Sequence, residues 1–91
     1  MYKFRNFYIP TRMEEGIRRY IDERIRPGEF LRAVISNDLK NAVAMADDEN
    51  ILNLPAYVAY FYMEAPSTCW GSREKMESWL KRRKEEIEDE S

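Results

Sequence analysis

The sequence contains no histidine and a single cysteine, Cys69. The absence of histidine excludes acid–base catalysis by imidazole and metal sites built on imidazole ligands. One cysteine cannot form a disulfide within the chain, and this scarcity fits a reducing compartment. No apolar run approaches the roughly 20 residues of a membrane-spanning helix, and the start MYKFRNFYIP lacks the apolar core of a signal peptide. We therefore expect a protein that stays in a reducing interior and crosses no membrane.

Basic residues are missing from the middle of the chain. Residues 41–72 contain no Lys or Arg and four acidic residues, whereas residues 1–40 contain nine basic and six acidic residues. The net charge of the 91 residues is −2. Because proteins of duplex DNA are more often strongly basic, we expect no DNA binding. The basic first third suits one small anionic ligand, although solvated helix faces explain it without a ligand.

The most aromatic stretch of the chain covers residues 54–66. A helix that is apolar all round must be buried over most of its circumference, so we expect this stretch to be the central helix. Asn53 is expected to cap the helix, and Pro66 to end it. The positions at helical spacing that should face the core are Leu54, Tyr57, Val58, Phe61, Tyr62 and Ala65.

Apolar residues recur at helical spacing in four other segments, and a chain of this length forms one domain. The expected helices cover residues 10–24, 29–36, 39–47 and the segment after Ser72. The second and third are alternatively one bent helix, and residues 47–50 are expected to be a polar link. The sequence thus predicts an all-α fold, a compact bundle of four to five short helices, over residues 10–80. An N-terminal arm without a strand partner (1–9) precedes it, and a charged helical tail (81–91) follows.

Two groups of residues have the chemistry of a metal or catalytic site. The acidic residues that could ligate Mg²⁺ or Ca²⁺ are Asp38, Asp47, Asp48 and Glu49. They lack the glycine and the spaced glutamate of an EF-hand loop, so helix caps and a solvated link explain them better. Cys69 has no histidine to act as its base, and a buried filler beside Trp70 is the simpler interpretation. We therefore expect no metal, no cofactor and no enzymatic activity.

The side chains best suited to a ligand are arginines of the first helix and aromatic residues of the second half. Arginine binds phosphate in a bidentate manner, and aromatic rings stack on bases. The predicted ligand-binding residues are Arg12, Arg19, Tyr57, Tyr60 and Trp70. Ion pairs within the helix explain part of the arginine pattern without a ligand. The tyrosines point in more directions than one small core absorbs, which also fits a contact between subunits of a homo-oligomer.

An ordered series of short motifs resembles a family of short proteins encoded by bacteriophages and prophages. The motifs lie within residues 9–80 and include Pro27-Gly28-Glu29-Phe30-Leu31, Ala33-Val34, Asn37-Asp38-Leu39, Ala46-Asp47, Asn50, Leu54-Pro55-Ala56-Tyr57-Val58, Ala65-Pro66 and Cys69-Trp70-Gly71-Ser72. The resemblance implies a phage accessory protein in the cytoplasm of a bacterial host. It carries no catalytic or binding residues onto this chain.

Two functions follow as expectations from the residues and the resemblance together. The first is an anti-defence protein that acts by binding and sequesters a nucleotide immune signal in an oligomer. The alternative is a protein–protein inhibitor of a host defence or metabolic enzyme, which would dock the acidic middle segment on a basic partner.

Overall fold

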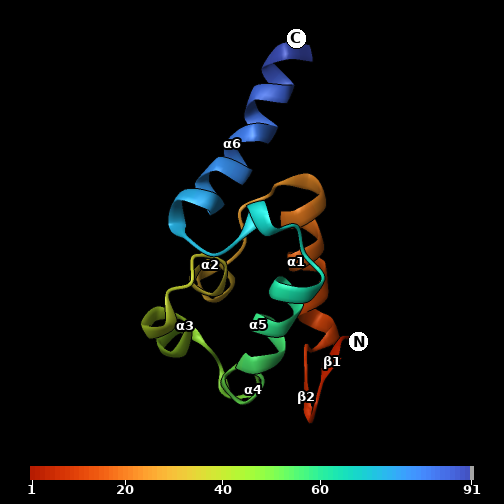
Figure 1. Cartoon of the computed structure of the whole chain (residues 1–91), viewed down its shortest axis with the longest axis vertical. Helices are drawn as coiled ribbons and strands as arrows, with labels where there is room; N and C mark the ends of the chain where they lie inside the picture. Colours follow the sequence, from red (N-terminus) through yellow and green to blue (C-terminus); the bar gives the residue numbers. More distant parts are fainter. Residues whose placement is uncertain (91) are drawn as a thin grey trace.

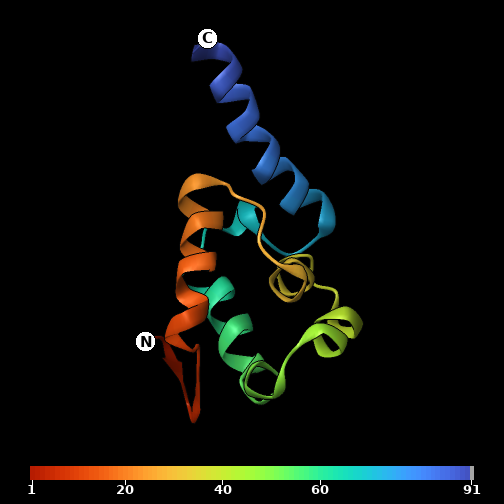
Figure 2. The same ribbon diagram turned by 180° about the vertical axis from the view of Figure 1, so that it is seen from behind.

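Six α-helices and a small hairpin make up the chain in a computed structural model, which describes residues 1–90, with side chains placed through Lys81 (Figure 1). The fold is mostly α-helical, as predicted, and α6 extends away from the other elements in both views (Figures 1 and 2). The elements in chain order are β1 (Lys3–Phe4), β2 (Phe7–Tyr8), α1 (Thr11–Glu23), α2 (Glu29–Ile35), α3 (Leu39–Met45), α4 (Asp48–Leu52), α5 (Leu54–Met63), the 3-10 turn η1 (Ser67–Cys69) and α6 (Arg73–Glu90).

The N-terminal arm supplies its own strand partner, so the prediction of an unpaired arm was wrong. β1 and β2 pair in antiparallel fashion, with Lys3 opposite Tyr8 and Phe4 opposite Phe7. The two-residue turn between them places Arg5 in the left-handed region, at φ 55°. The hairpin packs against α5, and the Tyr8 N–H donates to Asn53 Oδ1 at 2.9 Å. Pairing and packing together compensate for the small size of the hairpin.

The helices α1 and α2 agree with the predicted segments and hold much of the core. α1 follows Pro10 and buries Ile17 and Tyr20. A Cβ atom at Gly16 would lie 3.4 Å from Leu31 Cδ1, so glycine lets the two helices approach closely. All but two of the seven residues of α2 are buried. With so many buried residues, α2 forms a large part of the core together with α5.

The break between α2 and α3 is confirmed, but the burial of α3 differs from the prediction. Asn37 adopts a left-handed conformation at φ 60° and separates the two helices. The Asp38 carboxylate accepts the Asn41 N–H at 3.2 Å and caps α3. Leu39, Ala42, Val43 and Ala46 recur at helical spacing and were expected to share one face, but Ala42 is buried whereas Leu39 is 67% exposed. α3 is short and packs mainly against α2, so most of its apolar side chains remain at the surface.

The predicted polar link over residues 47–50 is mostly helix. Asp47 caps α4, because its Oδ1 accepts the Asn50 N–H at 2.8 Å. Asn53 precedes α5 as predicted but does not cap it with its side chain. Its Oδ1 accepts the Tyr8 N–H, and its Nδ2 donates to the Glu49 carbonyl at 2.9 Å. A residue predicted from local capping therefore joins α4, α5 and the hairpin.

α5 is the central helix, and its inward face is the predicted one only in part: Tyr57 and Phe61 are fully buried, as predicted. The buried residues are Ala56, Tyr57, Ala59 and Phe61. Val58 and Tyr62, which were predicted to face the core, are 45% and 76% exposed. Because α5 is apolar all round, periodicity could not select its buried face. The positions of α1, α2 and the hairpin around it make that choice.

α6 is attached to the rest of the fold through its first two turns. The helix follows Ser72 as predicted, and the Lys75 N–H donates to Ser72 Oγ at 3.1 Å, so Ser72 caps α6. Trp79 is buried, and its Nε1–H donates to the Tyr20 carbonyl at 2.9 Å. The tail expected at residues 81–91 continues the helix through Glu90; Ser91 and the side chains from residue 82 onward lie outside the described part.

Candidate binding site

The predicted ligand residue Arg12 is engaged by two carboxylates of the chain itself. Its Nη2 lies 2.8 Å from Asp47 Oδ2 and 3.1 Å from Glu49 Oε1. The other Glu49 oxygen accepts the Tyr8 hydroxyl at 2.7 Å. The hydrogen bonds that Arg12 donates to Glu49 and Asp47 raise its pKa, and the one to Glu49 has the larger effect. Arg12 therefore links α1 to α4, and Glu49 in turn links α4 to the hairpin.

Arg19 lies in a charge network along α1. Its Nε is 3.2 Å from Glu15 Oε1, and Arg18 also binds Glu15, at 2.7 Å. Arg18 reaches Glu23 at 2.8 Å as well. The hydrogen bond from Arg18 is the main reason that the pKa of Glu15 is lowered. An incoming phosphate would have to compete with these carboxylates for both arginines.

Tyr57 and Trp70 belong to the core and its edge. Tyr57 is fully buried, its hydroxyl donates to Asn50 Oδ1 at 2.6 Å, and burial raises its pKa. Its ring packs edge-on against Phe30 at a centroid distance of 5.0 Å. Trp70 is partly buried, and its ring lies 6.0 Å from that of Phe61. Within one chain, the ring of Tyr57 has no free face for a base.

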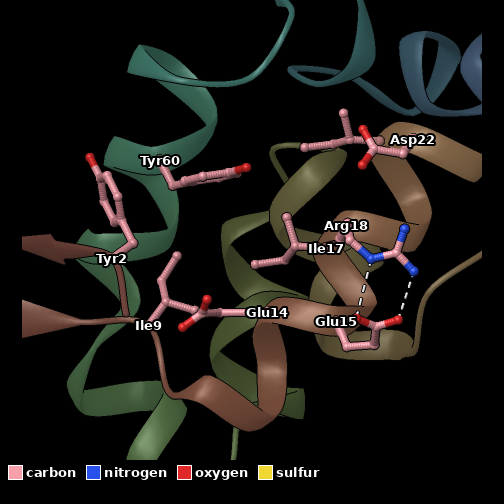
Figure 3. A pocket seen from close by; sticks show the side chains of 9 residues that line it. Tyr2, Ile9, Glu14, Glu15, Ile17, Arg18, Asp22 and Tyr60 are labelled. Carbon is pink, nitrogen blue, oxygen red and sulfur yellow. Dashed lines mark hydrogen bonds and ion pairs between the residues drawn. The ribbon is translucent and has the colours of Figure 1, made fainter.

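Among the predicted site residues, Tyr60 lines a pocket that lies between the hairpin, α1 and α5 (Figure 3). The pocket has a volume of about 340 Å³, within the usual range for small ligands. Tyr2 and Tyr60 form one side, with ring centroids 5.3 Å apart and planes at 81°. The other lining residues are Ile9, Glu14, Glu15, Ile17, Arg18, Ile21 and Asp22. We call this the Tyr2–Tyr60 pocket.

The charge of the Tyr2–Tyr60 pocket is negative. Three carboxylates and one guanidinium line it, which gives a formal charge of −2. Burial and then the charge of Asp22 are the largest causes that raise the pKa of Tyr60. Glu14, Arg18 and Asp22 were not predicted to form a site. Their spacing of four residues places them on one face of α1, a signal that was available in the sequence.

A second hollow lies on the outer side of α5 and is wholly apolar. Its volume is about 460 Å³. Phe4 reaches it from the hairpin, and every other lining residue belongs to α5. The lining residues are Phe4, Leu54, Pro55, Val58, Ala59, Tyr62 and Met63. We call it the α5 groove.

Cys69 is fully buried, and burial raises the pKa of its thiol to about 11. The ordinary pKa of a cysteine thiol is 9.0, so the thiolate fraction at neutral pH falls by about 100-fold, since each pKa unit is a factor of ten. We therefore expect the folded protein to react with a disulfide reagent at least about 100-fold more slowly than the chain in denaturant. The absorbance of the released thiolate measures both rates. Equal rates would contradict the burial of Cys69.

Over the described residues, no three Cys, Asp or Glu side chains come together as metal ligands would. No helix in this part of the chain is long and apolar enough to cross a membrane. Comparison with protein-family models, curated proteins and solved structures finds no match.

Proposed function

We propose that this chain is a phage accessory protein that acts by binding a host protein through the α5 groove, without catalysis. The observation that carries the proposal is the exposure of large apolar side chains around this groove. Val58, Tyr62 and Met63 are 45%, 76% and 58% exposed. Contiguous exposed apolar surface marks interaction sites, and Tyr and Met are enriched in such interfaces. The phage setting rests on the resemblance of the sequence motifs.

The shape of the α5 groove favours an amphipathic segment as the bound element. The groove runs along one helix and has Phe4 of the hairpin on one side. Figure 1 shows α5 between the hairpin and α3. A partner helix can lay its apolar face into such a hydrophobic groove, and anchors at helical spacing then fill it.

The charge around the α5 groove favours a basic partner. α4 and α5 come from the segment of residues 41–72, which holds four acids and no base. The hairpin adds Lys3 and Arg5 on either side of Phe4, and Arg12 of α1 pairs with two of the acids, so acids remain in excess by one. Opposite charge at an interface rim increases the association rate and the specificity. The proposed partner therefore presents an apolar segment with basic flanks, as proteins that bind nucleic acids often do.

The nucleotide version of the function has less support. Arg12 and Arg19 already bind carboxylates, and Tyr57 is enclosed. A second copy of the chain is the other possible occupant of the groove. Both alternatives become outcomes of the same experiment.

We expect the double variant Tyr62→Ala, Met63→Ala to bind the host partner at least about 30-fold more weakly than the unchanged chain, because two hot-spot anchors are removed. Host lysate is passed over both proteins, and the protein retained only by the unchanged chain is then purified. Calorimetry with the two purified proteins gives the affinities. The retained protein should bear an apolar segment with basic flanks, and its affinity should fall as salt rises.

Met45→Ala is the matched control, because Met45 is 49% exposed but lies outside the α5 groove. Its affinity should equal that of the unchanged chain. Equal affinities for all three proteins would contradict the proposal. So would a groove-dependent dimer in light scattering, or a tight complex with a cyclic dinucleotide that the double variant retains.

A further inference from the structure

The Tyr2–Tyr60 pocket lies apart from the α5 groove and shares no lining residue with it. Its two tyrosines come from the hairpin and from α5, while its charged side chains project from α1 (Figure 3). Ile9, Ile17 and Ile21 form the apolar part of its lining, and the first two are buried. The tertiary fold thus combines aromatic, apolar and acidic side chains around one small cavity.

The one guanidinium of the pocket is not available to a ligand anion. Arg18 binds Glu15 through two hydrogen bonds, of 2.7 and 3.2 Å, and also pairs with Glu23. Glu14 and Asp22 also line the pocket, and Glu14 lies 3.7 Å from the Met1 amino group. Among the residues that the structure describes, Asp22 has no basic side chain within ion-pair distance. An anionic ligand would therefore meet three carboxylates, and the cations beside them, Arg18 and the Met1 ammonium, already pair with carboxylates of the chain.

Glu14 offers an acceptor that a donor could satisfy. Its Oε1 is buried and has no hydrogen bond within the described structure. The Met1 amino group lies 3.7 Å from this oxygen, in a partly exposed pair that is longer than a hydrogen bond. This pair shows that an ammonium group fits against the carboxylate. A buried acceptor without a donor costs free energy, and a charged N–H donor would remove that cost.

The two tyrosine rings complete the chemistry of cation recognition. Their edge-to-face arrangement, at 81°, presents the face of one ring beside the edge of the other. A cation within about 6 Å of a ring face is attracted by the ring quadrupole. Tyr60 is half-buried, and the charges of Asp22 and Glu14 both contribute to raising the pKa of its hydroxyl. The rings and the carboxylates therefore line the same cavity closely enough to contact one ligand.

We infer that the Tyr2–Tyr60 pocket binds a small organic cation, a primary ammonium or guanidinium group held by Glu14 and Asp22 against Tyr2 and Tyr60. The same group is present in free diamines and in Lys or Arg side chains. Phosphate-bearing nucleotides are excluded from this pocket by its charge. The inference is independent of the α5 groove, so either proposal can fail alone.

The test uses agmatine and putrescine as probes, with 1,4-butanediol as the neutral analogue of putrescine. We expect calorimetry to show binding of both cations, no binding of the diol, and weaker binding as salt rises. A short capped peptide that carries one arginine separates the two sources: tighter binding than agmatine assigns the cation to a protein side chain, and weaker binding to a free amine. No binding of any cation at millimolar concentration would overturn the inference, and so would equal binding of putrescine and the diol.

The Glu14→Gln variant keeps the side-chain shape and removes the charge, so cation affinity should fall by about tenfold. Glu74→Gln in α6 is the matched control, since it makes the same change in net charge away from the pocket. It should bind like the unchanged chain. Equal affinities for Glu14→Gln and Glu74→Gln would overturn the inference. Shifts of the Tyr2 and Tyr60 ring signals in NMR spectra of the unchanged chain give a second measurement that needs no variant, and rings that stay unshifted at saturating agmatine would overturn it as well.

Discussion

Replacing Phe61 with alanine is expected to lower the free energy of unfolding by about 3–5 kcal/mol. Phe61 is fully buried on α5 and packs against the rings of Tyr60 and Trp70, at centroid distances of 5.5 and 6.0 Å. Alanine would leave a cavity that these large neighbours cannot fill. Small domains have only about 5–15 kcal/mol of stability, so the loss is a large fraction of the total. Urea unfolding followed by circular dichroism measures it.

The adjacent residue on α5 provides the control. Tyr62 is 76% exposed, so Tyr62→Ala should change the unfolding free energy by less than about 0.5 kcal/mol. The two substitutions remove similar rings from neighbouring positions of the same helix. Similar costs for both would show that α5 does not bury the face described above.

Replacing Trp79 with alanine is expected to cost about 3–5 kcal/mol as well. The Trp79 ring is buried, and its N–H donates a hydrogen bond to the Tyr20 carbonyl. The Arg24 guanidinium lies 4.1 Å from the ring centroid. Together with Met76, Trp79 fixes α6 to the body of the fold. Amide hydrogen exchange should therefore show that the first turns of α6 lose protection, in addition to the shift of the urea midpoint.

Trp79→Phe separates the ring from the hydrogen bond. It keeps most of the apolar contact but leaves the Tyr20 carbonyl without its donor, so a smaller loss of about 1–3 kcal/mol is expected. The order of stability should be unchanged chain, then Trp79→Phe, then Trp79→Ala. An alanine variant as stable as the unchanged chain would mean that α6 contributes nothing to the fold.

Local signals in the sequence predicted most of the helices. Pro10 marks the start of α1, Asn37 separates α2 from α3, and Ser72 caps α6. These predictions succeeded because capping, left-handed residues and proline act over a few neighbouring positions. The burial of Cys69 was also predicted, from its residue type and the absence of a base.

The hairpin and α4 were missed because their stability does not come from local propensity. Two-residue strands and a five-residue helix are too short to produce a clear periodic pattern. Glu49 and Asn53 stabilise both elements through hydrogen bonds to residues more than 40 positions away, such as Tyr8. Such partners cannot be identified from the neighbouring sequence.

At the candidate site, too, the sequence identified suitable residue types but not their partners in the fold. Of the five predicted ligand residues, Tyr60 lines the Tyr2–Tyr60 pocket, while Arg12 and Arg19 pair with carboxylates. Tyr57 and Trp70 pack in or beside the core. Residue type correctly marked side chains that make strong interactions. It could not distinguish an internal partner from a ligand, because both satisfy the same chemistry.

The sequence by itself determined a mostly helical chain with an aromatic central helix, since composition, spacing and capping act locally. The tertiary structure decided which face of α5 is buried, and it thereby left Val58, Tyr62 and Met63 at the surface. It also brought Tyr2 from the hairpin against Tyr60 and next to the acidic face of α1. An all-apolar helix has no preferred inner face of its own, so the neighbours that pack on it determine where the groove and the pocket form.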